Sequence, residues 1–230
     1  MAGNATSSRR QASHSLEPSS RPWEERVAAE RSEPAEEHVR LLVVLGSVTP
    51  PGRLRRALED AISRAEQNPH ADIELIDLAD RDLAFADGRD PGELDDDTAE
   101  VIASVSAAEA VLFATPVYRG SMTGALKNLF DQLPVQALEG KVVALAAMGG
   151  SDHHFLGPDR HLRDVLSFFG ALVLPVSVYL TGADFPDGTP SERAAQALDE
   201  LLAATISLAA RLADGAEFGP SPLAARAIRR

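Results

Sequence analysis

The chain of 230 residues contains no cysteine. This absence excludes disulfide bonds, catalysis by a thiolate and metal sites built from thiolates, and it fits a cytoplasmic protein. No apolar run approaches the roughly 18 residues that a membrane-spanning helix needs, so we expect no membrane association. Arg9 and Arg10 are not followed by the apolar stretch of a secretion signal, and we expect no such signal.

Basic residues are few relative to acidic ones. The chain has 22 Lys and Arg against 35 Asp and Glu, which gives a net charge of −13. Acidic side chains are concentrated between Asp72 and Glu109. A surface of this sign repels nucleic acid and anionic membranes, so we expect neither as a partner.

Composition divides the chain into three parts. Residues 1–38 are rich in Ser, Arg, Glu and Pro and show no apolar periodicity, which predicts a disordered N-terminal arm. Residues 39–213 carry all the regular apolar patterns and predict one domain. Residues 214–230 predict an irregular C-terminal tail.

Strand and helix patterns alternate through the central part. Alternating strands and helices form right-handed βαβ units and therefore a parallel sheet covered on both faces. The fold class is α/β, and the arrangement suits a flavodoxin-like three-layer sandwich whose five-stranded parallel sheet has the order 2-1-3-4-5. Pro175 moves the fifth strand towards an edge. The expected strands are 39–45, 71–78, 110–115, 141–148 and 171–180, and the expected helices are 52–67, 98–108, 123–133, 159–170 and 189–213. Asp97 or Thr98 is the expected cap of the second helix, and Thr189 or Ser191 that of the last.

The loop after the first strand has the features of an anion site. Ser47 and Thr49 offer hydroxyls, Arg53 supplies a positive charge, and the helix that follows begins with unpaired amides. The spacing matches neither GxGxxG nor the P-loop motif, which excludes a dinucleotide fold or a P-loop NTPase. An ordinary turn is the alternative at this position.

Two further loops meet the same edge of the predicted sheet. After the third strand come Pro116, Val117, Tyr118, Arg119 and Gly120. Tyr118 and Arg119 could stack on or clamp a flat ligand, and Gly120 allows its close approach. After the fourth strand, Gly149, Gly150 and Ser151 let backbone amides reach a ligand. His153 and His154 lack metal-ligand spacing, and no set of catalytic residues is visible, so we expect neither a metal site nor a protein acid or base.

Three segments resemble the NADPH-dependent FMN reductase family: ATPVYRGSMTGALKNLFDQLP, ALEGKVVALAAMGGS and FFGALVLPVSVYL. The likeness is strongest to the FMN reductases of two-component alkanesulfonate-type monooxygenase systems, and it covers about residues 40–212. The resemblance implies hydride transfer from NADPH or NADH to FMN and a monooxygenase that receives the reduced flavin. It implies that Ser47, Arg53 and the neighbours of Arg53 bind the phosphate. Thr49 stands where the family often has Arg, and Arg53 and Arg55 could compensate for the hydroxyls that this loop lacks relative to the family. It also implies that residues 116–120 frame the isoalloxazine and that residues 149–151 line its pyrimidine side.

Other functions remain open at this point. An enzyme of this kind could retain FMN and reduce a quinone, an azo dye or a metal oxyanion. The chain could also be a flavodoxin-type electron carrier, or an interaction protein without flavin. We further expect a homodimer or homotetramer, because the helix at 123–133 carries more apolar residues than one sheet face needs, among them Phe130, and the last helix is rich in Leu and Ala.

Overall fold

The computed structural model describes residues 38–49 and 51–212. Residues 1–37 of the predicted arm and the predicted tail at 214–230 lie outside this part. The described part is built on a parallel sheet in which β2, β1, β3, β4 and β5 lie side by side in that order, and β6 also pairs with β4. The strands are β1 (Val39–Leu45), β2 (Ala71–Asp77), β3 (Ala110–Pro116), β4 (Val142–Met148), β5 (Leu172–Val173) and β6 (Val178–Leu180). The predicted strand order and fold class are confirmed.

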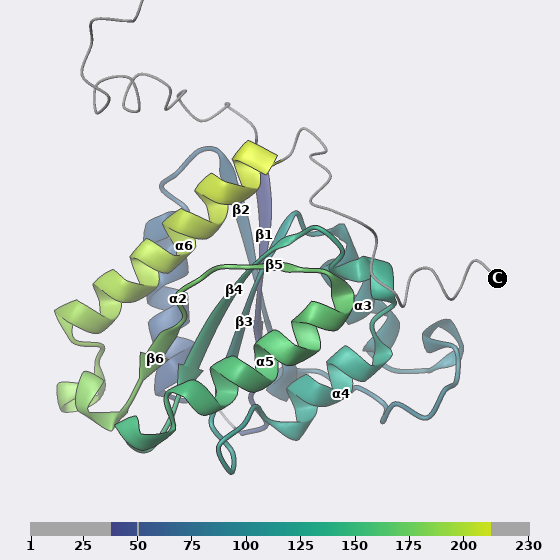
Figure 1. Ribbon diagram of the computed structural model, residues 1–230, viewed down its shortest axis with the longest axis horizontal. Helices are drawn as coiled ribbons and strands as arrows, with labels where there is room; N and C mark the ends of the chain where they lie inside the picture. The colour runs from purple at the N-terminus through teal and green to yellow at the C-terminus, as the bar shows by residue number, and fades with distance from the viewer. Residues whose placement is uncertain (1–37, 50, 213–230) are drawn as a thin grey trace, which may run out of the picture. The chain divides into compact units, whose positions relative to one another are not determined.

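Helices cover both faces of the sheet (Figure 1). One layer holds α2 (Arg53–Ala65) and α6 (Glu192–Leu212), and the other holds α3 (Thr98–Ala107), α4 (Gly124–Gln132) and α5 (Leu156–Phe169). β1, β3 and β4 are almost entirely buried, as expected for central strands covered on both sides. Within the described ranges, no helix is long and apolar enough to cross a membrane.

The helices follow from their apolar spacing and their end residues. In α2 the buried side chains are Leu54, Ala57, Leu58, Ala61 and Ile62, which recur at helical intervals on one face. The predicted cap Ser191 is confirmed, since its hydroxyl accepts a hydrogen bond from the Ala194 amide at 3.3 Å. α5 ends at Gly170, whose φ of 70° lies in the left-handed region that favours glycine.

Asp97 stands at the N-cap position of α3, as expected, but its side chain does not cap the helix. The carboxylate of Asp97 accepts from the Asp82 amide instead, and Asp96 accepts from the amide of Thr98 at 2.8 Å. Both contacts join residues of the acidic segment before α3 to one another and so stabilise its conformation. Between Asp82 and Asp96, the Ala86 amide donates to the side-chain amide of Asn128 on α4, and the Ala84 carbonyl accepts from it. The long acidic loop is therefore tied to the helix that follows the third strand.

The fifth predicted strand is interrupted, which corrects the expectation of one continuous strand at 171–180. Pro175 has no amide to donate, and the chain leaves the sheet between β5 and β6. The Leu174 carbonyl instead accepts from the guanidinium of Arg163 at 2.8 Å, and Arg163 is itself held by Asp159 at 3.0 Å. A side chain of α5 thus provides the bond that a regular strand would have made.

The apolar residues of α4 are not an exposed patch, which corrects the reason given for an oligomer. Leu126, Leu129, Phe130 and Leu133 are all buried within the chain. The ring of Phe130 lies 4.8 Å from that of Phe113 on β3 and 6.3 Å from that of Phe169 on α5. The Leu and Ala residues on the inner side of α6 are likewise buried against α2 and the sheet.

Phe130 should therefore act on folding. Replacing Phe130 by Ala removes a ring packed between two others, and we expect the free energy of unfolding to fall by about 3–5 kcal/mol. Urea denaturation followed by circular dichroism measures this change. Phe85→Ala is the matched control, because Phe85 is 81% exposed and should change stability by less than about 0.5 kcal/mol. A Phe130→Ala protein as stable as the control would contradict the packing described here.

Candidate functional site

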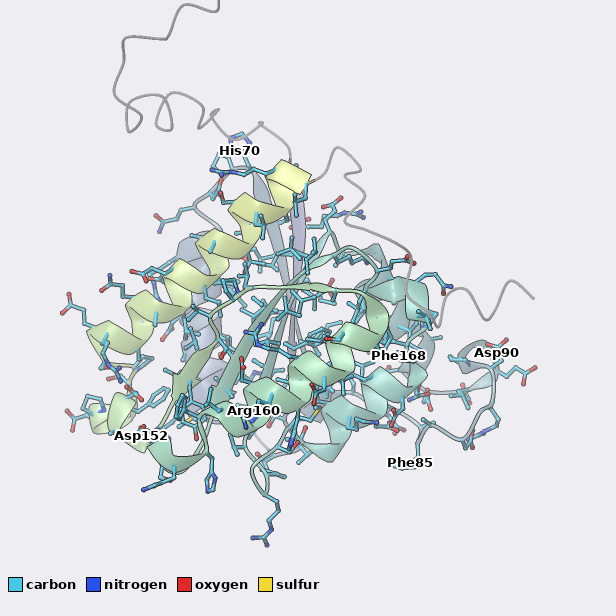
Figure 2. The ribbon with its side chains drawn as sticks, in the orientation of Figure 1. His70, Phe85, Asp90, Asp152, Arg160 and Phe168 are labelled. Atoms are coloured by element: carbon cyan, nitrogen blue, oxygen red, sulfur yellow. The ribbon has the colours of Figure 1, made fainter. Side chains whose placement is uncertain are left out.

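The loops that follow β1, β3 and β4 meet at one edge of the sheet. Leu45 pairs with Ala114, and Pro116 pairs with Met148, so the carboxyl ends of the three strands are in register. In Figure 2, Asp152 lies at this end of the molecule, while His70 marks the opposite end, where β2 begins. The predicted adjacency of the three loops is therefore present. In an open α/β sheet, this edge is where ligands bind.

The first loop is compact and leads into an uncapped helix. Ser47 is buried, and its hydroxyl bonds both the carbonyl and the amide of Thr49, at 3.3 and 3.4 Å. No side chain caps the start of α2 at Gly52. Glycine is required at position 46, because a Cβ atom there would lie 2.6 Å from the Cβ of Leu126. The Ser47 hydroxyl is thus engaged within the loop, whereas Thr49 is exposed, and α4 packs closely against Gly46.

Two predicted cations of this loop have different environments. The guanidinium of Arg53 lies over the ring of Phe185, 5.6 Å from its centroid. Arg55 instead contacts Glu59 at 2.8 Å, Asp77 at 3.2 Å and Asp80 at 2.5 Å. These carboxylates raise the pKa of Arg55 above its ordinary value, beginning with the hydrogen bond to Glu59. Arg55 is engaged by the end of β2 and is not directed to the loop, which corrects its expected role.

The segment after β6 was not anticipated as part of this edge. Phe185 follows a short turn in which Thr181 and Asp184 form a capping box, and Arg193 holds the Asp184 carboxylate. This turn fixes the ring on which Arg53 lies. The sequence signal was available, because Thr181 and Asp184 have the spacing of a capping box.

A buried threonine joins the first loop to the second. The Thr123 hydroxyl donates to the Gly46 carbonyl at 2.6 Å and accepts from the Leu126 amide at 3.2 Å. The Thr123 amide in turn donates to the hydroxyl of Thr115, also at 3.2 Å. Both threonines are completely buried. Thr123 therefore caps α4 and holds the loops after β1 and β3 at a fixed separation.

The tip of the second loop is a tight turn. Tyr118 and Ser121 exchange two backbone hydrogen bonds, at 2.9 and 3.0 Å. Between them, Arg119 has a φ of 54° and Gly120 a φ of 79°, as in the turns that favour Asn or Gly at both central positions. An arginine in this conformation costs about 1–2 kcal/mol. Tyr118 and Arg119 are both exposed, so their side chains are free to contact a ligand.

The third loop packs against a tyrosine of β6. A Cβ atom at Gly149 would lie 1.9 Å from the Tyr179 hydroxyl oxygen, so only glycine fits there. That hydroxyl donates to the Ser151 carbonyl at 2.8 Å. Burial, followed by the nearby charge of Asp152, raises the pKa of Tyr179 above its ordinary value. The Ser151 hydroxyl lies 3.3 Å from the Nδ1 atom of His153.

The structure thus assembles most of the predicted positions. Ser47, Thr49, residues 116–120 and residues 149–151 lie on adjacent loops, and Arg53 begins the helix beside them. In the described part of the chain, no group of three His, Cys, Asp or Glu side chains is placed to hold a metal ion. A groove of about 550 Å³ lies elsewhere, between α6 and residues 174–180, and none of the predicted site residues lines it.

The strand order and the loops at the carboxyl edge define a flavodoxin-like α/β protein, a class of fold in which ligands bind at that edge. A family model described as NADPH-dependent FMN reductase matches residues 39–185, more than half of the chain. The chain belongs to this family of oxidoreductases.

Curated relatives support the same assignment. An NAD(P)H-dependent FAD/FMN reductase of Geobacillus thermodenitrificans is 46% identical over 111 residues, which cover 48% of this chain and 60% of that protein, less than two thirds of its length. The NADH-dependent FMN reductase SfnF of Pseudomonas fluorescens is 42% identical over 65% of this chain and 77% of its own. An FMN reductase (NADPH) of Pseudomonas aeruginosa is 35% identical over 76% of this chain and 90% of its own. The family and the enzyme class predicted from the sequence are confirmed.

Solved structures agree on the fold. The apo form of an NADH:FMN oxidoreductase, EMOB, aligns with a TM-score of 0.62 at 24% identity, over 81% of this chain and 95% of that one. A flavodoxin from the domain Archaea aligns with a TM-score of 0.52 at 13% identity, over 74% and 98% of the two chains. At these identities the likeness supports the fold alone.

Removing the Thr123 hydroxyl should loosen the site. Thr123→Val leaves the buried Gly46 carbonyl and the Leu126 amide without this partner, and we expect a loss of about 1–3 kcal/mol in the free energy of unfolding. Thr205→Val is the control, because the equally buried Thr205 only adds a bond to the Leu201 carbonyl within α6. Urea denaturation of both proteins is the measurement. Equal losses in the two would show that Thr123 has no special role.

Proposed function

We propose that the three loops bind FMN and that the chain catalyses hydride transfer from NADPH or NADH to it. The observation that carries this proposal is the meeting of an uncapped helix start, an exposed Tyr-Arg turn and a Gly-Gly loop at one edge of the sheet, in a member of this family. Hydride acceptance is the chemistry that the flavin supplies when bound. The protein then needs to bind and orient both partners, and no protein acid or base is required.

The donors at the first loop fit a phosphate. The amides at the start of α2 and the hydroxyls of Ser47 and Thr49 are the groups that bind phosphate at helix N-termini. Arg53 sits at the first position of the helix, and its long side chain can leave Phe185 for an anion. We assign these residues to the phosphate of FMN.

The second and third loops fit a flat ring. Pro116 and Val117 continue β3 to the edge, and the turn that follows carries Tyr118, Arg119 and Gly120. We assign this stretch to the isoalloxazine. Gly149, Gly150 and Ser151 lie on the neighbouring strand end, where backbone groups can bond the pyrimidine side of the ring.

We further propose that the protein acts in the cytoplasm and that the reduced flavin passes to a partner monooxygenase, as the resemblance of the sequence implies for the flavin. A homodimer or homotetramer remains part of this proposal. Its contact surface must exclude Phe130, and exposed apolar residues such as Phe85, Phe168 and Val176 are the places to look for it.

A second function is favoured by one relative. An NADPH azoreductase of a Bacillus species is 30% identical over 56% of this chain. An enzyme that retains FMN and reduces an azo dye, a quinone or a metal oxyanion uses the same site. The two functions differ in whether FMN leaves the protein during the reaction.

Steady-state kinetics test the function. We expect the purified chain to oxidise NADPH or NADH rapidly when free FMN is added and slowly without it. The absorbance spectrum of the dialysed protein is the companion measurement, and we expect no flavin bands in it. Strong flavin bands with azo-dye reduction and no need for added FMN would favour the second function. Flavin binding without NAD(P)H oxidation would leave an electron carrier.

Arg53 tests the phosphate site. Arg53→Ala should weaken the binding of FMN by about 1.5–3 kcal/mol. The affinity for riboflavin, which has no phosphate, should remain almost unchanged. Quenching of flavin fluorescence gives both affinities. Arg56→Ala is the matched control, since Arg56 is exposed on the same helix but lies one turn beyond the start. An equal loss for both flavins would remove Arg53 from the phosphate site.

A further inference from the structure

The turn at 118–121 lacks the support that such turns normally have. A two-residue hairpin loop usually joins two paired strands, but here Tyr118 and Ser121 form an isolated bridge. Arg119 and Gly120 both have positive φ angles, a strained conformation for a residue with a side chain such as Arg119. Something outside the turn must therefore hold it.

The first turns of α5 provide this support through two contacts. A Cβ atom at Gly157 would lie 2.3 Å from the Gly120 carbonyl oxygen, so the backbones of helix and turn touch. One helical turn later, the Nδ1 atom of His161 lies 2.8 Å from the Ser121 hydroxyl. Gly157 and His161 are four residues apart and face the same side. Helix α5 therefore contacts the turn at two successive residues, Gly120 and Ser121.

The same helix is continuous with the third loop. After Ser151, the chain makes a short turn at Asp152–His154 and enters α5 at Leu156. Asp152 and, on α5, Arg160 lie near this edge in Figure 2. A contact from α5 to the turn thus fixes the second loop relative to the third. The phosphate end has a support that does not involve α5, the bond from Thr123 to the Gly46 carbonyl.

We infer that Gly157 and His161 are positioning residues that set the Tyr118–Ser121 turn against the flavin ring and the nicotinamide. This inference rests on the proposed FMN site. Neither residue contacts the reacting atoms, and both act through the turn. Because the phosphate end is held separately, a loosened turn weakens binding of the ring and leaves binding of the phosphate intact. FMN and riboflavin then lose affinity by the same factor.

The hydrogen-bonded pair gives the first test. His161→Ala and Ser121→Ala should each raise the dissociation constants of FMN and riboflavin by the same factor, about three- to tenfold. The double variant should be no weaker than either single one, because both remove one interaction. His161→Asn, whose side-chain amide can bond Ser121 from nearly the Nδ1 position, should restore most of the affinity. Fluorescence titration with each flavin is the measurement, and His70→Ala, at the other end of the sheet, is the control.

The backbone contact gives the second test. Gly157→Ala forces helix and turn apart, and a displacement of about 1 Å can lower kcat/KM for NADPH by up to about 100-fold. Gly124→Ala is the matched control, since Gly124 also lies in the first turn of a helix, but a Cβ atom there meets open space. Circular dichroism and Tm establish that both proteins fold. Should Gly157→Ala fail to fold, the His161 and Ser121 variants decide the question.

Each outcome decides for or against the inference. Equal losses for both flavins, a non-additive double variant and rescue by Asn support it. Variants that behave like the controls, additive losses, or a loss confined to FMN would overturn it. A wild-type chain that neither binds flavin nor oxidises NADPH would overturn the proposed function, and this inference with it. A wild-type chain that does both, with variants equal to the controls, would overturn this inference alone.

Discussion

The hydrogen bond from the Thr123 hydroxyl to the Gly46 carbonyl is the contact on which the functional edge depends. It is short, at 2.6 Å, and completely buried, so water cannot replace either partner. The same hydroxyl caps α4, and the amide of Thr123 is held by Thr115 at the end of β3. One side chain therefore joins the end of β1, the end of β3 and the start of α4. The loops that the sheet brings together are held there by this network.

Charge at this edge is controlled by pairing. The chain is acidic overall, yet an anion site needs a cation that is not already paired with a carboxylate. Arg55 is surrounded by Glu59, Asp77 and Asp80, while Arg53, two residues earlier, lies against an aromatic ring. An aromatic face holds a guanidinium loosely compared with three carboxylates. In the proposed FMN site, Arg53 is therefore the arginine that can turn to a phosphate, whereas Arg55 holds the end of β2 to α2.

The sheet order and most helix positions were predictable, because buried parallel strands and amphipathic helices leave strong periodic patterns. The three loops followed from that order. Contacts between distant segments were not predictable. The break at Pro175 needs Arg163 from α5, and the engagement of Arg55 needs Asp77 from β2. The apolar residues of α4 wrongly predicted an exposed surface, because the ring of Phe130 is covered by Phe113 and Phe169, which come from other elements.

Glycine residues allow the close packing between loops and helices at this site. At Gly46 a side chain would meet Leu126, at Gly149 it would meet Tyr179, and at Gly157 it would meet the Gly120 carbonyl. Each contact brings a loop or helix against the next element at a distance that only glycine allows. When a cofactor carries the chemistry, the protein contributes orientation, and backbone packing supplies it without titratable groups. This packing accounts for the glycines that follow β1 and β4, and we expect the residues that govern the proposed site to include some that never touch the ligand.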